Sequence, residues 1–188
     1  NEADDTVHFY DGETEEKEGV YVAMASFITS YARLKTISSA QKIQDDYNAG
    51  KSNIQFVYAD TDSLHCLSPD MKLPEGLDID PTRLGAWDHE ANFKKAKFLR
   101  QKCYIENHII DEETYNKGIK GENWTLYSRD SNGFYELKVT VAGMPANCHK
   151  NVTFRNFKIG ASYSGKLQPK VVSGGTILKD VDFTIKEV

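Results

Sequence analysis

The sequence contains few cysteines, and they are far apart. Its 188 residues include three, Cys66, Cys103 and Cys148, and no C-x-x-C pair. Three such residues cannot form a disulfide framework, and without close pairs they cannot form a zinc ribbon. We therefore expect free thiols in a reducing compartment, the cytoplasm of the cell that makes the protein.

Long apolar runs are also absent. No stretch approaches the roughly 18 residues that a membrane helix needs, and the acidic first residues do not resemble a signal peptide. Hydrophobic residues make up 39% of the chain and aromatic residues 11%, which excludes a disordered tail. We expect one domain, with room for a small appendage, in a chain that begins as though cut from a longer protein.

The net charge of -5 is unevenly distributed along the chain. Residues 1–18 hold eight acids and one base, whereas residues 91–105 and 137–179 are basic and contain no acid. Such a basic surface repels itself unless a polyanion neutralises it, and nucleic-acid phosphates are the usual partner. The charge pattern alone also allows a merely solvated basic face.

The first half of the chain predicts a helix followed by a hairpin. Apolar residues recur at three- and four-residue spacing over 20–47, and Asn48 and Gly50 supply a stop. Residues 54–58 and 63–67 then read as two short strands joined by a turn.

The second half is richer in strands. Residues 69–81 read as a loop, residues 85–90 as strand-like, and residues 102–110 and 135–141 as strands separated by a polar hairpin region. From residue 144 the chain reads as short strands, including 152–159, punctuated by glycines and without convincing helix. The predicted class is α+β, with a small β-rich module at the end.

The turn between the two hairpin strands carries the strongest chemical signal. Asp60 and Asp62 flank Thr61 at its tip, and two carboxylates so close repel each other unless a cation offsets them. Mg²⁺ binds such oxygens and keeps positions for substrate phosphates, as nucleotidyl transfer requires. The turn alone is equally compatible with two solvated Asp side chains in an Asx-type turn.

Other chemical motifs are weaker. The run from Gly160 to Lys166 spells a P-loop except that Leu167 stands where Ser or Thr should bind Mg²⁺, and Pro169 blocks the helix that should follow. The histidines show no metal-ligand spacing, and no nucleophile elbow is present.

Two motifs in the sequence have a known counterpart. Residues 58–63 read YADTDS, which matches motif C (YxDTDS) of family B DNA polymerases, and residues 102–104 read KCY, which matches their KxY motif. The flanking runs YVAMASFITSYAR, FKKAKFLRQKCYIE, VAGM and VTFRNFKIG resemble the C-terminal part of the protein-primed replicative polymerases of small tailed bacteriophages. The resemblance extends over nearly the whole chain from residue 20 onward.

The resemblance implies a partial polymerase fold, with an antiparallel palm sheet and packed helices followed by a small β-rich thumb. Residues 1–19 would be an acidic leader from a missing upstream region, residues 20–143 the C-terminal part of the palm, and residues 144–188 the thumb. The palm would carry the chemistry, and the thumb would grip duplex backbone without reading sequence.

It also implies roles for particular residues. Asp62 would be a direct ligand of the catalytic Mg²⁺ or Mn²⁺ ions, and Asp60 the weaker, supporting carboxylate. The residues that shape the motif C turn would be Tyr58, Thr61 and Ser63. Those at the primer terminus would be Arg100, Lys102 and Tyr104, and those of the thumb that contact DNA would be Lys150, Arg155, Lys158, Lys166 and Lys170.

The implied partners are duplex and primer-template DNA, a dNTP and a terminal priming protein, with no membrane, in the cytoplasm of a bacterial host. The implied reaction is addition of dNTPs to a primer 3′-OH by two-metal nucleotidyl transfer.

Several family elements are not found in the sequence. Motif A (DxxSLYP), which supplies another metal-binding Asp, motif B (Kx3NSxYG) and the 3′–5′ exonuclease are all absent. We therefore expect a fragment with negligible polymerase activity on its own. The alternative is a non-catalytic duplex-DNA-binding module or one subunit of a split enzyme.

Overall fold

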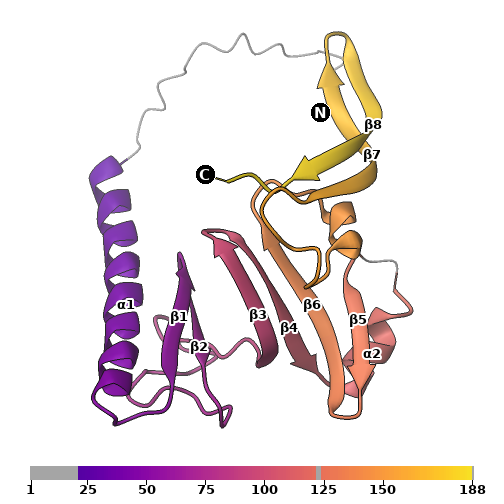
Figure 1. Ribbon diagram of the computed structural model, residues 1–188. Coiled ribbons are helices and arrows are strands. Elements are labelled where there is room, and N and C mark those ends of the chain that lie inside the picture. The colour runs from indigo at the N-terminus through magenta and orange to yellow at the C-terminus, as the bar shows by residue number, and fades with distance from the viewer. Residues whose placement is uncertain (1–20, 122–123, 188) are drawn as a thin grey trace.

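The computed structural model describes residues 21–121 and 124–187. Within the last two strands, Ser162–Val172 and Gly175–Thr184, the side chains of residues 166–170, 172, 176, 178–179 and 181 are excepted. The acidic leader that we expected at residues 1–19 lies outside this range. Three antiparallel sheets follow one long helix along the chain (Figure 1). The order of elements confirms the α+β class. No helix among the described residues is long and apolar enough to cross a membrane.

The long helix α1 (Val22–Asn48) lies beside the hairpin of β1 (Gln55–Asp60) and β2 (Ser63–Leu67). It ends as predicted, because Gly50 takes a positive φ of 67° and its N–H bonds to the carbonyl of Tyr47. The hairpin is also as predicted, with Asp60 paired to Ser63 across the turn.

A four-stranded sheet lies next to the hairpin, in the spatial order β3-β4-β6-β5. Its strands are β3 (Phe93–Arg100), β4 (Cys103–Ile110), β5 (Leu126–Asp130) and β6 (Gly133–Val141). Side chains of β4 alternate between two faces: Cys103 and Ile105 are fully buried in the main core, and Tyr104 and Glu106 point to the opposite face. That opposite face meets the β1–β2 hairpin through ring contacts and hydrogen bonds.

The chain after the sheet forms a 3₁₀ helix η1 (Ala146–Asn151) and a two-stranded ribbon of β7 (Ser162–Val172) and β8 (Gly175–Thr184). One apolar core joins this module to the sheet. It contains Ile105 and Val141 from the sheet and Cys148, Phe157 and Ile185 from the module.

Besides the strand break expected at Gly165, through which β7 continues, the structure corrects three local predictions. Residues 85–90 are loop with one isolated bridge at Trp87, because the indole packs beside α1 and its N–H bonds to Ser39. Residues 152–159 are turns held by Asn156 side-chain bonds to Thr153 and Asn151.

The third correction lies in the predicted polar hairpin region, which contains the helix α2 (Glu112–Gly118). Asp111 caps it by accepting the N–H of Thr114 at 2.7 Å, and two glutamates follow in the first turn. A capping Asp followed by acidic residues is a common helix start, so this helix was predictable from the sequence although it was not predicted.

Candidate active site

The motif C turn is a tight corner held by its own backbone. Thr61 takes a left-handed φ of 54°, and the N–H of Asp62 donates to the carbonyl of Asp60 at 2.6 Å. The Ser63 hydroxyl donates to the same carbonyl at 3.1 Å, and Thr36 of α1 donates to the carbonyl of Thr61 at 3.1 Å. The turn is therefore fixed from the hairpin and from the helix.

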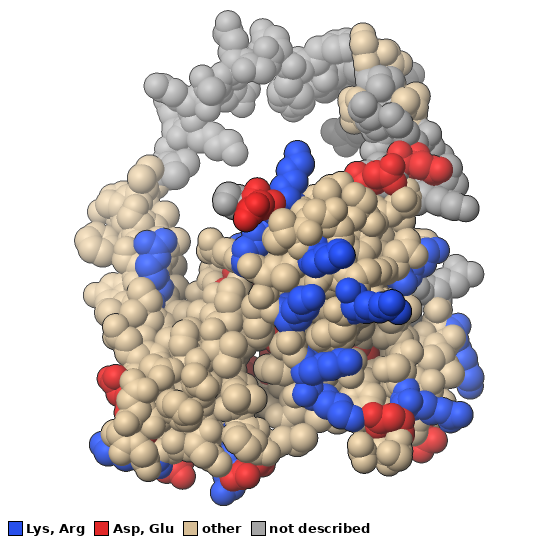
Figure 2. Space-filling view, viewed as in Figure 1, with Lys and Arg blue, Asp and Glu red and all other residues tan. Residues whose placement is uncertain are grey.

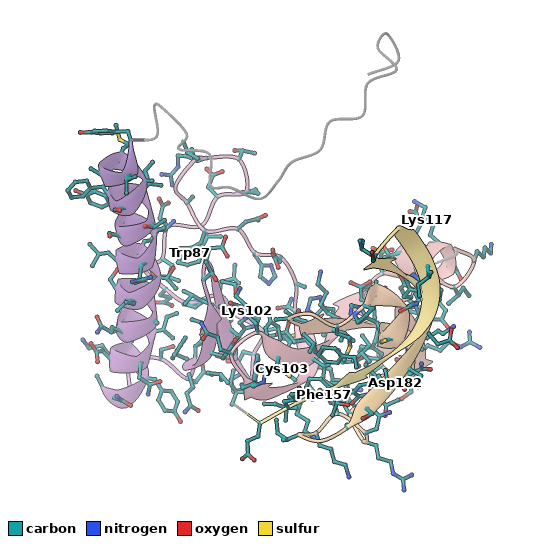
Figure 3. All side chains as sticks on the ribbon, turned by 90° about the horizontal axis from the view of Figure 1, so that it is seen from above. Trp87, Lys102, Cys103, Lys117, Phe157 and Asp182 are labelled. Atoms are coloured by element: carbon teal, nitrogen blue, oxygen red, sulfur yellow. The ribbon has the colours of Figure 1, made fainter. Side chains whose placement is uncertain are left out.

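Lys102 of the KxY motif reaches across to this turn. Its Nζ lies 2.9 Å from Oδ1 of Asp60 and 3.2 Å from Oγ1 of Thr61, and its backbone N–H donates to the hydroxyl of Tyr58 at 2.9 Å. The hydrogen bond and charge of Asp60 raise the pKa of Lys102. Viewed from above, Lys102 lies between the hairpin and the four-stranded sheet (Figure 3). The structure thus brings motif C and the KxY motif together.

Aromatic rings pack together next to the contact between Lys102 and the motif C turn. Tyr58 stacks on Phe98 with ring centroids 4.8 Å apart, and Tyr104 lies 5.2 Å from Tyr58. Tyr104 is only 8% exposed, and its burial raises the pKa of the phenol. Tyr104 therefore packs inside the interface between the β1–β2 hairpin and the four-stranded sheet, which we call the seam.

The two aspartates differ in environment. Asp60 is 8% exposed and engaged by Lys102, whereas the side chain of Asp62 is exposed and forms no ion pair with the described residues. Carboxylate oxygens suit Mg²⁺, so the exposed side chain of Asp62 fits the role of a metal ligand. The carboxylate of Asp60 already pairs with Lys102, so a metal ion bound there would share that carboxylate with the lysine. No group of three or more His, Cys, Asp or Glu side chains that could hold an ion occurs in the described part of the chain. The described residues therefore supply only part of the ligands that a metal site needs, and we call this their partial donor set.

The basic residues spread over a wider surface. Figure 2 shows Lys and Arg gathered over the half of this face that holds the four-stranded sheet and the module after it. Lys150, Arg155 and Lys158 are exposed, and Lys150 lies over the ring of Trp124. Arg100 is half-buried at the end of β3, with a buried Nε that has no hydrogen-bond partner among the described residues. The side chains of Lys166 and Lys170 lie outside the described residues.

A buried charged cluster lies beneath the turn and was not predicted, because His65 and His108 show no ligand spacing in the sequence. Both contact Glu106, which is 4% exposed: Nδ1 of His65 lies 2.7 Å from Oε1, and Nε2 of His108 lies 3.1 Å from Oε2. The available signal was that Glu106 and His108 continue the same face of the strand as Tyr104.

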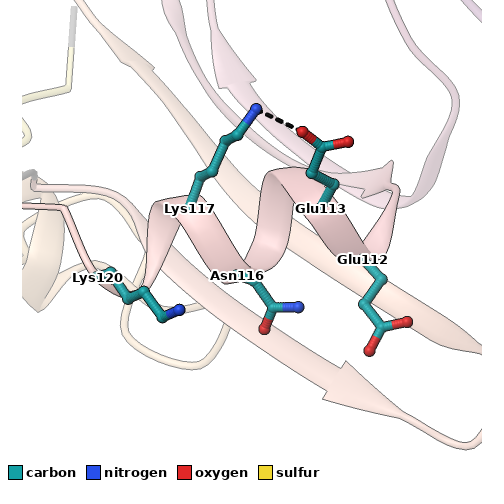
Figure 4. A pocket seen from close by; sticks show the side chains of 5 residues that line it. All are labelled: Glu112, Glu113, Asn116, Lys117 and Lys120. Carbon is teal, nitrogen blue, oxygen red and sulfur yellow. Dashed lines mark ion pairs between the residues drawn. The ribbon is translucent and has the colours of Figure 1, made fainter.

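A shallow pocket elsewhere has no relation to this site. It lies on α2 and is lined by Glu112, Asn116 and Lys120 together with the Glu113–Lys117 ion pair, whose charged atoms are 2.6 Å apart (Figure 4). That ion pair is solvent-exposed, so the pocket offers no enclosed binding cavity.

Comparison with known proteins agrees with this geometry. No protein-family model matches the chain. The chain is 39% identical over 185 residues to the DNA polymerase of Bacillus phage B103, and 40% identical over 177 residues to that of Bacillus phage phi29. It is also 37% identical over 181 residues to the DNA polymerase of Streptococcus phage Cp-1. The chain is a homologue of phi29-type phage DNA polymerases.

Solved structures give the same result. Phi29 DNA polymerase complexed with primer-template DNA matches with a TM-score of 0.67 at 38% identity over 93% of this chain. The complex of phi29 polymerase with primer-template DNA and incoming nucleotide substrates matches with a TM-score of 0.65 at 36% identity over 88% of this chain. The similarity to phi29-type polymerases therefore covers the fold as well as the overall sequence.

The match covers only part of each polymerase. The chain spans 29% of the B103 polymerase, 28% of the phi29 polymerase and 26% of the Cp-1 polymerase. It corresponds to a segment of a phi29-type polymerase.

Proposed function

We propose that this chain is the C-terminal palm and thumb portion of a protein-primed family B DNA polymerase. The complete enzyme would add dNTPs to a primer 3′-OH, or to a hydroxyl of a terminal protein during initiation. The observation that carries the proposal is the contact of the Asp60–Asp62 turn with Lys102, because it joins both polymerase motifs at one place on the surface.

Within this proposal, residues 20–143 belong to the palm and residues 144–188 to the thumb. Asp62 would bind a catalytic Mg²⁺ or Mn²⁺ ion directly, and Asp60 would support it. Such ions activate the attacking oxygen and stabilise the leaving one in nucleotidyl transfer. Tyr58, Thr61 and Ser63 hold the turn in place, and the exposed position of Asp62 supports its role.

DNA would bind along the basic face. Lys102 lies at the tip of the site, where a primer phosphate could replace Asp60 as its partner. Tyr104 would support the primer terminus indirectly, by packing on the ring of Tyr58. Arg100 and the thumb residues Lys150, Arg155 and Lys158 would contact phosphates, which suits a replicative enzyme that reads no sequence. The complete enzyme would act in the cytoplasm of the bacterial host.

A first experiment measures binding of the 188-residue chain to primer-template DNA at several salt concentrations. Neutralising Lys150, Arg155 and Lys158 to Gln should reduce the slope of log K against log salt by about 0.9 for each phosphate that the protein no longer neutralises. Lys117→Gln on α2 serves as the matched control and should leave the slope unchanged. Equal slopes for both variants would contradict the proposed thumb contacts.

A second experiment addresses catalysis. The isolated chain should extend a primer negligibly, because the donor set on its described residues is partial. When the chain is mixed with a purified N-terminal portion of a phi29-type polymerase, extension should appear, and Asp62→Asn should abolish it without weakening DNA binding. Robust extension by the isolated chain, or wild-type rates with Asp62→Asn, would contradict the assignment.

The second candidate function is a non-catalytic DNA-binding module or a subunit of a split polymerase. The partial donor set of the described residues favours it for the chain by itself. DNA binding without extension in the mixed assay would identify a DNA-binding module. Extension only in the mixture would exclude that module, and it agrees both with the palm and thumb portion of a single-chain enzyme and with a split subunit.

A further inference from the structure

Glu106 connects the four-stranded sheet to the hairpin that carries motif C. It lies on β4, is 4% exposed and uses both carboxylate oxygens: Oε1 lies 2.7 Å from Nδ1 of His65 on β2, and Oε2 lies 3.1 Å from Nε2 of His108 on its own strand. A buried carboxylate is costly unless it is fully hydrogen-bonded. The position of His65 is therefore tied to the sheet.

From His65 the contacts continue to the turn. Nε2 of His65 lies 3.2 Å from the hydroxyl of Ser63, and that hydroxyl lies 3.1 Å from the carbonyl of Asp60. The same carbonyl accepts the N–H of Asp62 at 2.6 Å. A continuous line of short polar contacts thus runs from the sheet to the backbone between the two aspartates. Since the single Ser63 hydroxyl hydrogen goes to Asp60, the contact with His65 is a hydrogen bond when Nε2 of His65 carries a hydrogen.

We propose that Glu106 and His65 are positioning residues of the candidate site, which hold the Asp60–Ser63 turn in register with Lys102. That this turn belongs to a polymerase active site rests on the proposed function. The pair itself is a new assignment, because neither residue belongs to motif C or to the KxY motif.

The sheet topology explains why a polar connection is needed. The β1–β2 hairpin is a separate sheet, and among the described residues no backbone ladder joins it to β3 or β4. At the turn end, Lys102 also bonds to Tyr58, Asp60 and Thr61 of the hairpin. Around His65 the other contacts are ring contacts of Tyr58 and His65 with Phe98 and Tyr104. Ring packing tolerates small slides, whereas hydrogen bonds to both oxygens of one carboxylate fix a direction as well as a distance.

The other charged groups around the pair belong to the neighbouring strands. Glu136 of β6 lies 4.0 Å from Nδ1 of His108. Lys102 is directed to Asp60 at the other end of the seam. Among the described ion pairs, His65 is the group through which Glu106 reaches the hairpin.

The test uses amide hydrogen exchange in the 188-residue chain without DNA, nucleotide or metal. The reporters are the N–H of Asp62, bonded to Asp60, and the N–H of Lys102, bonded to Tyr58. His65→Phe keeps a ring and removes both nitrogens, and it should accelerate exchange of both reporters at least about tenfold. Exchange of the core amide of Phe157 should stay unchanged.

Glu106→Gln is the milder variant, because an amide keeps one acceptor for His65, and it should give a smaller acceleration at the same reporters. Glu113→Gln on α2 removes an exposed ion pair and is the matched control. Unchanged reporter exchange in both His65→Phe and Glu106→Gln would overturn the proposal. Acceleration spread equally over the core would also overturn it, because it would indicate a purely structural role.

A spectroscopic measurement covers the case in which His65→Phe fails to fold. In the unmodified chain, ¹⁵N–¹H spectra of the His65 ring should show a hydrogen on Nδ1, which donates to Glu106. A ring without hydrogen on Nδ1 would overturn the pairing. Neither readout involves DNA or catalysis, so a failure of the polymerase assays with positive results here would count against the proposed function alone.

Discussion

At the scale of single residues, two backbone positions at the site are unusual. Thr61 and Lys102 both adopt left-handed φ values, 54° and 52°, and neither is glycine. Such conformations cost on the order of 1 kcal/mol or more and persist where surrounding contacts hold them. Here each residue's side chain contacts the other, with Nζ of Lys102 at 3.2 Å from Oγ1 of Thr61. The two turns therefore stabilise each other's strained backbone.

Replacement of Lys102 by Met tests how much its contact with Asp60 contributes to the unfolding free energy. The apolar stem is retained, but the nearly buried Asp60 carboxylate is left without its cation, so we expect the unfolding free energy to fall by more than in the exposed control pair. Urea denaturation followed by circular dichroism measures it. Lys117→Met removes an exposed ion pair and should cost under about 0.5 kcal/mol. Equal decreases in the two variants would show that the Asp60 contact contributes nothing.

Acid stability should depend on Glu106. Burial opposes its ionisation, but the hydrogen bonds from His108 and His65 outweigh burial and lower the pKa of Glu106 to about 2. A carboxylate with a depressed pKa stabilises the fold above its unfolded pKa, roughly 4.3, and this stability disappears as the pH falls through the folded pKa.

Unfolding free energies measured at several pH values below about 5 should therefore fall less steeply for Glu106→Gln than for the unmodified chain. The contribution at neutral pH is on the order of 3 kcal/mol. Parallel pH profiles for the two proteins would mean that Glu106 does not titrate with folding.

At the scale of elements, the β7–β8 ribbon depends on a glycine. Gly165 lies where the register of the two strands shifts, and a Cβ there would come within 2.3 Å of Oδ1 of Asn147 and 2.8 Å of Sγ of Cys148. Only glycine lets β7 lie this close to η1. Gly165 was predicted to separate short strands, whereas the strand continues through it.

Gly165→Ala should therefore destabilise the protein by about 1–3 kcal/mol, because the added methyl group forces η1 and β7 apart. Thermal unfolding gives the measurement. Ala161→Gly, a change of the same methyl group at a half-buried position just before β7, provides the comparison and should shift stability by less. A neutral Gly165→Ala would mean that η1 moves aside freely.

At the scale of the whole molecule, the helix α1 exposes its apolar side. Phe27, Tyr31 and Leu34 are each more than 60% exposed, whereas the buried residues of α1 are the small polar residues Thr36 and Ser39 with Ile43. The apolar stripe that predicted the helix therefore faces outward. A surface of this kind favours association.

We expect the isolated chain to self-associate at micromolar concentration through this stripe. Light scattering coupled to size-exclusion chromatography should show a mass that rises with concentration, and the double change Phe27→Ser with Tyr31→Ser should abolish the rise. Val171→Ser, at an 82% exposed position on β7, is the control and should have no effect. Equal behaviour of the two variants would place the association elsewhere.

The sequence alone determined the long helix, the hairpin and two central strands, and which residue types could perform the chemistry. The turn with Asp60 and Asp62 and the helix over 20–47 were predictable because hydrophobic period, turn residues and motif spacing are local properties. The short helix α2 carried an equally local signal, the capping side chain of Asp111, although it was not predicted.

The tertiary structure decided how these pieces meet. The pairing of Lys102 with Asp60 joins residues that are far apart in the chain, and the Glu106–His65 pair joins two sheets with no ladder between them among the described residues. Such contacts depend on the relative placement of whole strands, which is set by core packing across the sheet and the module that follows it. No pattern confined to one segment encodes that placement.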